Sequence, residues 1–288
     1  MIAPTVRKEE ARVLPITELI ALSSQWTDSD PSGVRWTTIM HQSSIPFAVA
    51  QHRLNAAGRS TELAENKRLS LRLEGLKQEI TGVLTSWHRL DWMKSLVVAG
   101  TLTDEAFGCY AACDIDAFHV RMRSAFDYLA TLAWGAAQDR NGVGGSRSFS
   151  DLIKWLRKNG TRKAAFGPLY DTLFNAADWF EGLRGLRDLT VHQGGFTLVF
   201  PSPDAIGFRT LRMGANFTLR ESTLPSEVMC NDNIVDFRKY GCLHLCRLIS
   251  LSETVMKELL NQWDMNPAPN ARCSGGAVEM LPKWAASF

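Results

Sequence analysis

The chain has 288 residues, of which 45% are hydrophobic and 22% are charged, and its formal net charge is +2. These values are typical of a globular protein and exclude extensive disorder, while the small net charge neither requires nor excludes a nucleic-acid partner. No stretch approaches the roughly 20 apolar residues of a membrane-spanning helix, and the charged N-terminus lacks the apolar centre of a signal peptide. We therefore expect a cytoplasmic protein without a membrane segment.

The first part of the chain, residues 1–100, is predicted to form an N-terminal helical extension. Its clearest helix covers residues 60–98, where apolar side chains recur every three or four positions and so share one helix face. These side chains are Leu69, Leu73, Leu76, Ile80, Val83, Leu84 and Trp87.

Further helices are predicted over 104–137, 149–160 and 168–192, the last of them ending at Gly194 and Gly195. The long helix from residue 104 carries an apolar face that includes Ile115, Phe118 and Met122. Its opposite side carries three polar side chains, which we expect on a solvated face; they are His119, Arg123 and Asp127.

After the third of these helices the apolar period changes from that of a helix to that of strands. Residues 196–213 predict two strands around a turn that contains proline and glycine, and residues 216–222 suggest a third. A final helix is predicted over 233–263, and residues 264–288 form a loose tail. The expected fold class is therefore mainly α: a helical bundle with a small β-hairpin insertion at about 196–220.

Six cysteines raise the question of a metal site. Cys242 and Cys246 share a helix face, but His244 is two residues from each and points about 200° around the helix, so the three cannot bind one zinc ion. We expect these cysteines, and the pair Cys109 and Cys113, to be small buried hydrophobic residues. No metal or cofactor is expected.

The end of the third helix carries three side chains suited to RNA cleavage without a metal. Histidine exchanges protons near neutral pH, so His192 suits general acid–base catalysis. Arg187 can stabilise charge on a phosphate, and Arg184 beside it is predicted to bind RNA. Asp188 lies four residues before His192 and is expected to orient its ring by a hydrogen bond. The alternative is an ordinary polar helix end.

Arg187 and His192 are five residues apart, or about 140° around an ideal helix. From this spacing we expect one copy of the chain to present the two side chains poorly to a single phosphate. A second subunit, or an unwound helix end at Gly194, would bring them together.

The segment RDLTVH, residues 187–192, resembles the signature of HEPN domains (higher eukaryotes and prokaryotes nucleotide-binding), which is Arg, a polar residue, three residues and His. The resemblance covers residues 104–263 and implies a four-helix core, with the motif in its third helix. It does not cover residues 1–100, and the insertion at 196–220 departs from the minimal bundle.

The resemblance implies a metal-independent endoribonuclease that acts as a homodimer with a composite Arg/His site. Arg187, Asp188 and His192 match the motif. Family members act as toxins or in anti-phage defence, so an antitoxin or defence-system protein is an expected partner besides RNA. The alternatives are a non-catalytic module that dimerises or binds a partner, and a nucleotide-binding protein without nuclease activity.

Two further groups of basic side chains could contact RNA. Arg209, Arg212 and Arg220 lie in the predicted hairpin, interleaved with Phe208 and Phe217; the alternative places these rings in the core. On the first core helix, His119, Arg121 and Arg123 could line the same cleft or form a solvated face.

Overall fold

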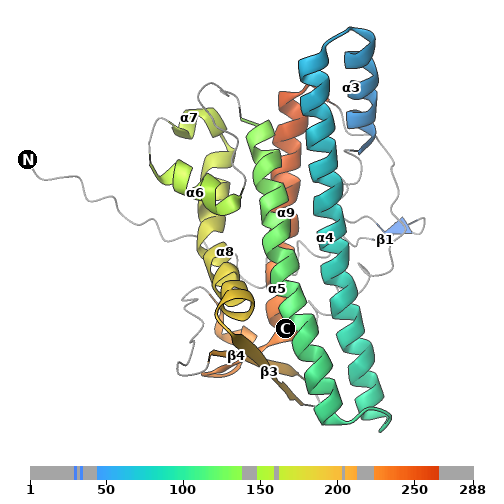
Figure 1. Ribbon diagram of the computed structural model, residues 1–288, viewed down its shortest axis with the longest axis vertical. Coiled ribbons are helices and arrows are strands. Elements are labelled where there is room, and N and C mark those ends of the chain that lie inside the picture. The colour runs from blue at the N-terminus through green and yellow to red at the C-terminus, as the bar shows by residue number, and fades with distance from the viewer. Residues whose placement is uncertain are drawn as a thin grey trace, which may run out of the picture.

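A computed structural model describes residues 29–30, 33–34, 44–137, 148–158, 162–202, 205–212 and 224–265. Over these residues the chain is mainly helical and carries a small antiparallel sheet (Figure 1), which confirms the predicted fold class. The predicted third strand over 216–222, the residues before 29 and the tail beyond 265 lie outside the described residues.

Four long helices run roughly side by side within the described part of the chain (Figure 1). α5 (Asp104–Gly135) contacts the other three, so it is the central helix of the bundle. These three are α4 (Ser60–Val98), α8 (Leu169–His192) and α9 (Phe237–Gln262). Three shorter helices lie at their sides: α3 (Ser44–Ala56), α6 (Phe149–Arg157) and α7 (Arg162–Phe166).

The regularly spaced apolar side chains that predicted the helices are buried together in one continuous core. All seven residues predicted for the buried face of α4 are at most 2% exposed. α5 begins where the Thr103 hydroxyl accepts the Ala106 N–H at 3.2 Å, which satisfies one of the free donors of a helix start. Ion pairs between Arg89 and Asp114, and between Arg121 and Glu79, also join α4 to α5, so α4 shares one core with the rest of the bundle.

The sheet lies at one end of the bundle, where β3 contacts both α5 and the end of α8 (Figure 1). Its strand order is β3 (Gly195–Pro201), β4 (Ile206–Arg212), β6 (Ile234–Asp236) and β5 (Met229–Asn231), and the pairs are antiparallel. The predicted hairpin is thus confirmed. A separate short ribbon pairs β1 (Ser29–Asp30) with β2 (Gly33–Val34).

Two predictions about the last helix and the cysteines need correction. The helix starts at Phe237 and not at 233, because Val235 pairs with Phe208 in the sheet and Asp236 caps the helix by accepting the Arg238 N–H. Cys242 and Cys246 are buried as predicted, but Cys109 and Cys113 are exposed, because this face of α5 has no described element packed over it.

Within the described ranges, no helix combines the length and the apolar composition that a membrane span requires.

Candidate functional site

Helix α8 ends at the segment that carries the predicted catalytic side chains. His192 is its last residue, and the Gln193 N–H donates to the Leu189 carbonyl oxygen at 3.2 Å. Gly194 follows with a φ of +66°, a left-handed conformation that glycine adopts readily and that commonly ends helices. β3 begins at Gly195, so the predicted helix end is confirmed and the strand starts beside the site.

Gly195 allows the strand to pass close to the helix end. A Cβ atom there would lie 2.8 Å from the Leu189 carbonyl oxygen, a backbone atom that cannot rotate away. We expect Gly195→Ala to lower the free energy of unfolding, measured by urea denaturation, by about 2 kcal/mol because β3 must shift. Gly108→Ala is the control, because its Cβ would meet only an atom 4.0 Å away; an equal loss in both variants would contradict this explanation.

Arg187 and His192 are in direct contact within one chain. The distance from Arg187 Nη1 to His192 Nε2 is 2.6 Å. Arginine has only donors, so Nε2 accepts this hydrogen bond and the ring proton of the neutral imidazole lies on Nδ1. The two side chains therefore meet within one copy, because the long arginine side chain reaches along the helix to its last residue. How one copy presents them to a phosphate stays a prediction.

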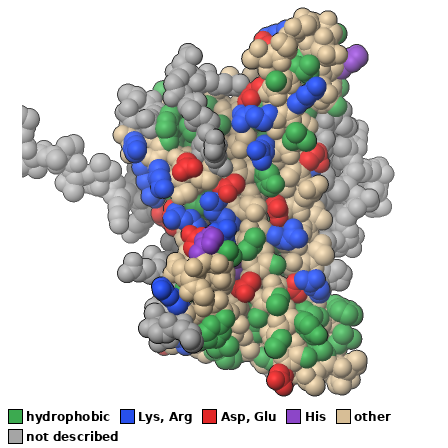
Figure 2. All heavy atoms as spheres, in the orientation of Figure 1, with side chains coloured by type: hydrophobic (Ala, Val, Ile, Leu, Met, Phe, Trp, Pro, Cys, Tyr) green, Lys and Arg blue, Asp and Glu red, His purple; other side chains and the backbone are tan. Residues whose placement is uncertain are grey.

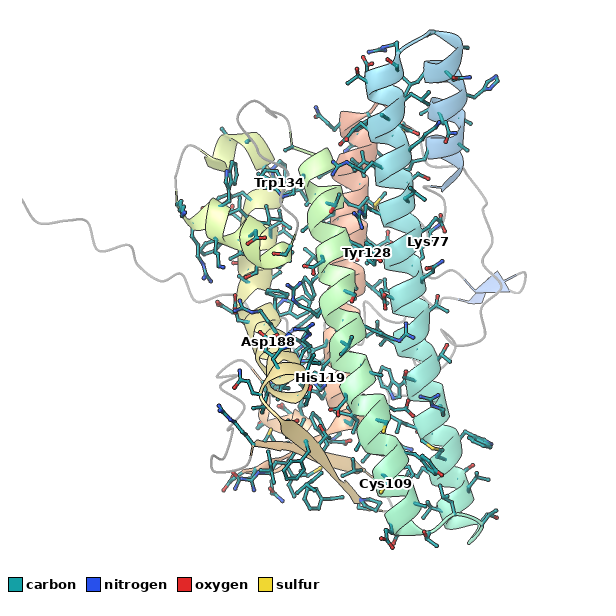
Figure 3. All side chains as sticks on the ribbon, viewed as in Figure 1. Lys77, Cys109, His119, Tyr128, Trp134 and Asp188 are labelled. Carbon is teal, nitrogen blue, oxygen red and sulfur yellow. The ribbon has the colours of Figure 1, made fainter. Side chains whose placement is uncertain are left out.

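Asp188 binds the arginines and not the histidine. Its Oδ1 accepts from Arg187 Nη1 at 2.9 Å, and its Oδ2 accepts from Arg184 Nε at 3.4 Å. The predicted hydrogen bond to His192 is absent among the described contacts, because Arg187 stands between the two groups. Asp188 therefore holds the guanidinium that in turn holds the ring. Figure 3 shows Asp188 on the lower part of α8, near β3.

One edge of the Arg187 guanidinium has donors to spare. Nη1 makes both described hydrogen bonds, whereas Nε is buried without a partner, and Nη2 has no hydrogen bond within the described part of the chain. Nη2 is therefore the donor left for a carboxylate or phosphate, because Nε has no partner but is shielded from solvent. The side chain is 27% exposed, so an anion can reach its outer end.

Arg184 belongs to the support of the site. Its Nη1 donates to Glu181 at 2.9 Å and to Ser150 Oγ of α6 at 3.0 Å, in addition to the contact of its Nε with Asp188. Two carboxylates thus compensate its charge. Its predicted role in binding RNA is untested by these contacts, which fasten α8 to α6.

The predicted basic hairpin is divided by the fold. Arg212 is exposed, and its Nη1 donates to Gln193 Oε1 at 3.1 Å, which brings it beside the end of α8. Arg209 is half-buried and lies opposite Leu198 in the sheet. Phe208 is buried in the core. Arg220 and Phe217 lie outside the described residues.

The outward face of β3 is the feature that the sequence did not reveal. Phe196, Leu198 and Phe200 are 38–43% exposed, whereas Thr197 between them is buried and donates to Asp116 Oδ1 of α5 at 2.6 Å. Burial raises the pKa of Asp116, an effect that the Thr197 hydrogen bond opposes. Because β3 is apolar on both faces, its alternation could not indicate which face is exposed.

His119 lies in the core, so it neither lines a cleft nor belongs to a solvated face. It is 1% exposed; its Nδ1 donates to the Ile115 carbonyl oxygen at 2.8 Å, and its Nε2 lies 3.2 Å from Tyr240 Oη. Burial lowers its pKa to about 3. The predicted solvated face is wrong for this residue, because α5 is covered by α9 and the sheet as well as by α4. Arg121 and Arg123 pair with Glu79 and Asp127.

Comparison of the chain with models of protein families, with curated proteins and with solved structures finds no match. Among the residues that the structure describes, no three His, Cys, Asp or Glu side chains gather closely enough to hold a metal ion. The function is therefore inferred from the side chains at the end of α8.

Proposed function

We propose that the protein is a metal-independent endoribonuclease of the HEPN type, with Arg187 and His192 as its catalytic pair. The contact between the Arg187 guanidinium and the His192 imidazole is the observation that carries this proposal. It places an anion-binding group against a proton acceptor at an exposed helix end. RNA cleavage begins when a ribose hydroxyl attacks the adjacent phosphate. This attack requires one group that binds the phosphate and one that accepts the hydroxyl proton.

Substrate binding would change the contact between the two side chains. A phosphate that binds Arg187 Nη2 and displaces His192 from Nη1 frees His192 Nε2. This nitrogen then accepts the proton of the 2′-hydroxyl group as the hydroxyl oxygen attacks phosphorus. The bond from phosphorus to the 5′-oxygen breaks, and the products are a 2′,3′-cyclic phosphate and a 5′-hydroxyl end. Arg187 neutralises charge on the phosphoryl oxygens. Asp188 keeps the guanidinium in place.

The 5′-oxygen needs a proton when it leaves, and one neutral histidine cannot supply this proton while accepting another. A protonated His192 from a second copy would supply it, so the proposal includes a homodimer with a composite site. A nuclease of this kind suits a toxin or an anti-phage effector that is held inactive by an antitoxin or another defence-system protein.

The test is cleavage of RNA in excess EDTA. We expect cleavage of an unstructured RNA to continue in EDTA and to leave 2′,3′-cyclic phosphate ends. A 2′-deoxynucleotide at a cleaved position removes the nucleophile and is expected to abolish cleavage there and nowhere else. Loss of cleavage in EDTA, continued cleavage at the deoxy position, or no cleavage of total cellular RNA by the folded protein would contradict the proposal.

A second candidate is a non-catalytic module that dimerises or binds a partner. The network of Arg184, Asp188, Glu181 and Ser150 favours it, because these contacts compensate charge and join two helices. In that case no RNA is cleaved, and His192→Ala lowers the melting temperature by several degrees because the residue serves the fold.

A further inference from the structure

Three alternate residues of β3 expose apolar side chains. Phe196 is 43% exposed, Leu198 is 38% exposed and Phe200 is 41% exposed, all on the side of the strand opposite to the buried Thr197. An exposed face of a strand is usually polar, and contiguous apolar patches on soluble proteins commonly mark binding surfaces. Hydrophobic side chains gather at this end of the molecule, over the lower parts of β3, α5 and α4 (Figure 2).

A basic side chain lies on the same face as the two phenylalanines. Residues directly opposite in an antiparallel pair share a face, and Arg209 is opposite Leu198, so its place in the sheet is between the two rings. Arg212 is opposite Gly195 and so belongs to the other side of the strand, but it is exposed at the end of β4 that is nearest to α8. The strands β3 and β4 contain these two arginines and no acidic residue. The face therefore combines aromatic rings with positive charge.

This face begins at the candidate active site. Phe196 is four residues after His192, and Arg212 donates to Gln193, the residue next to His192. Basic and acidic side chains gather with a histidine over the lower part of α8, on the same face of the molecule as the apolar region (Figure 2). Phe196 and Phe200 are separated by about 13 Å along the strand, so a single base cannot cover both rings.

We propose that the outward face of β3 and β4 is a stacking platform for single-stranded RNA, next to the Arg187–His192 pair. Bases stack on Phe196 and Phe200, and Arg209 and Arg212 neutralise the phosphates between them and the site. The bases of a duplex are already stacked on each other and cannot do this, so the platform selects unpaired RNA. This inference rests on the proposed function, because it names unpaired RNA as the substrate class of the proposed endoribonuclease.

The test measures binding to RNA that cannot be cleaved. A fluorescent 2′-O-methyl oligonucleotide of 12 unpaired nucleotides lacks the nucleophile, so its anisotropy reports affinity whether or not the protein is a nuclease. We expect the Phe196→Leu and Phe200→Leu variants each to bind about fivefold more weakly or worse, because leucine keeps the apolar surface but cannot stack. Tyrosine at either position is expected to keep the wild-type affinity.

Matched controls separate stacking from other effects. Phe174 is 40% exposed on α8, about 20 Å from Arg187 along the helix, and Phe174→Leu is expected to leave affinity unchanged. Arg209→Gln is expected to lower the slope of log Kd against log salt by about one. The same oligonucleotide annealed to its complement is expected to bind at least tenfold more weakly than the single strand.

Four results would overturn the platform. The first is that the wild-type protein does not bind the single strand, and the second is that it binds the duplex with equal affinity. The third is that a double Phe196→Leu/Phe200→Leu variant binds the single strand within twofold of wild type. The fourth is that the tyrosine variants lose affinity as the leucine variants do. If the double variant binds RNA normally but sediments as a monomer where the wild type is a dimer, the face joins two copies of the chain. Binding by the platform without cleavage of any RNA would contradict only the nuclease proposal.

Discussion

His192→Ala is expected to lower the rate of RNA cleavage by about 10²–10⁴-fold, the range typical of a lost general acid or base. Arg187→Ala is expected to have an effect of similar size, because it removes both the phosphate donors and the group that positions the ring. Arg187→Lys cannot restore the rate, since an ammonium group lacks the planar fork of donors. The measurement is single-turnover cleavage of a labelled RNA.

The fold must survive these substitutions for the rates to be informative. His192 is exposed at the end of α8, so its removal is expected to change the free energy of unfolding by about 1 kcal/mol or less, chiefly through loss of the exposed hydrogen bond from Arg187. His52→Ala, an exposed histidine on α3, is the control and should cleave RNA normally. Cleavage that is equal in the His192→Ala, His52→Ala and wild-type proteins would remove His192 from the mechanism.

Acid is expected to destabilise the protein through His119. Its pKa is about 3 in the folded chain because it is buried, and 6.5 is the ordinary value. Above pH 6.5 the ring is neutral in both states and contributes no pH dependence. Between pH 6.5 and about 3 the unfolded chain takes up a proton that the folded chain does not, so stability falls with pH by about 1.4 kcal/mol per unit.

The variant His119→Asn isolates this effect. Asparagine can keep a donor for the Ile115 carbonyl oxygen but does not titrate. Urea denaturation between pH 6 and pH 4 should therefore show a shallower dependence for the variant, by about 1 kcal/mol per pH unit. The pKa values of Asp116 and Asp236 are raised by burial and act with the opposite sign, but they act in both proteins and cancel in the difference. Identical slopes would show that the folded protein protonates His119 readily.

Much of the fold could be predicted because its signals are local. The spacing of Leu69, Leu73 and Leu76 predicts a buried helix face, and Gly194 predicts the end of α8, whatever else the chain does. The start of α9 could not be found in this way, because Ile234 and Val235 suit a helix and a strand equally. Pairing with β4, a segment more than 20 residues earlier, decides between the two.

The candidate site was predicted as a set of residues but not as a geometry. Its composition, with Arg187, Asp188 and His192 within six residues, is visible in the sequence. The hydrogen bonds between these side chains are not visible in the sequence, because helix geometry fixes the positions of the Cα atoms but not the conformation of a long side chain. The arginine lies between the acid and the histidine, and Arg184 is held by Glu181 and Ser150.

By itself, the sequence determined the mainly helical class, the hairpin and the residues gathered at the end of α8, because each depends on periodicity or on neighbours along the chain. Only the tertiary structure decided that His119 is buried and that Phe196 and Phe200 are exposed. Burial depends on which elements cover a face. α5 is covered on several sides, which encloses a polar residue, whereas the outward face of β3 has no described element over it and leaves two aromatic rings in contact with solvent.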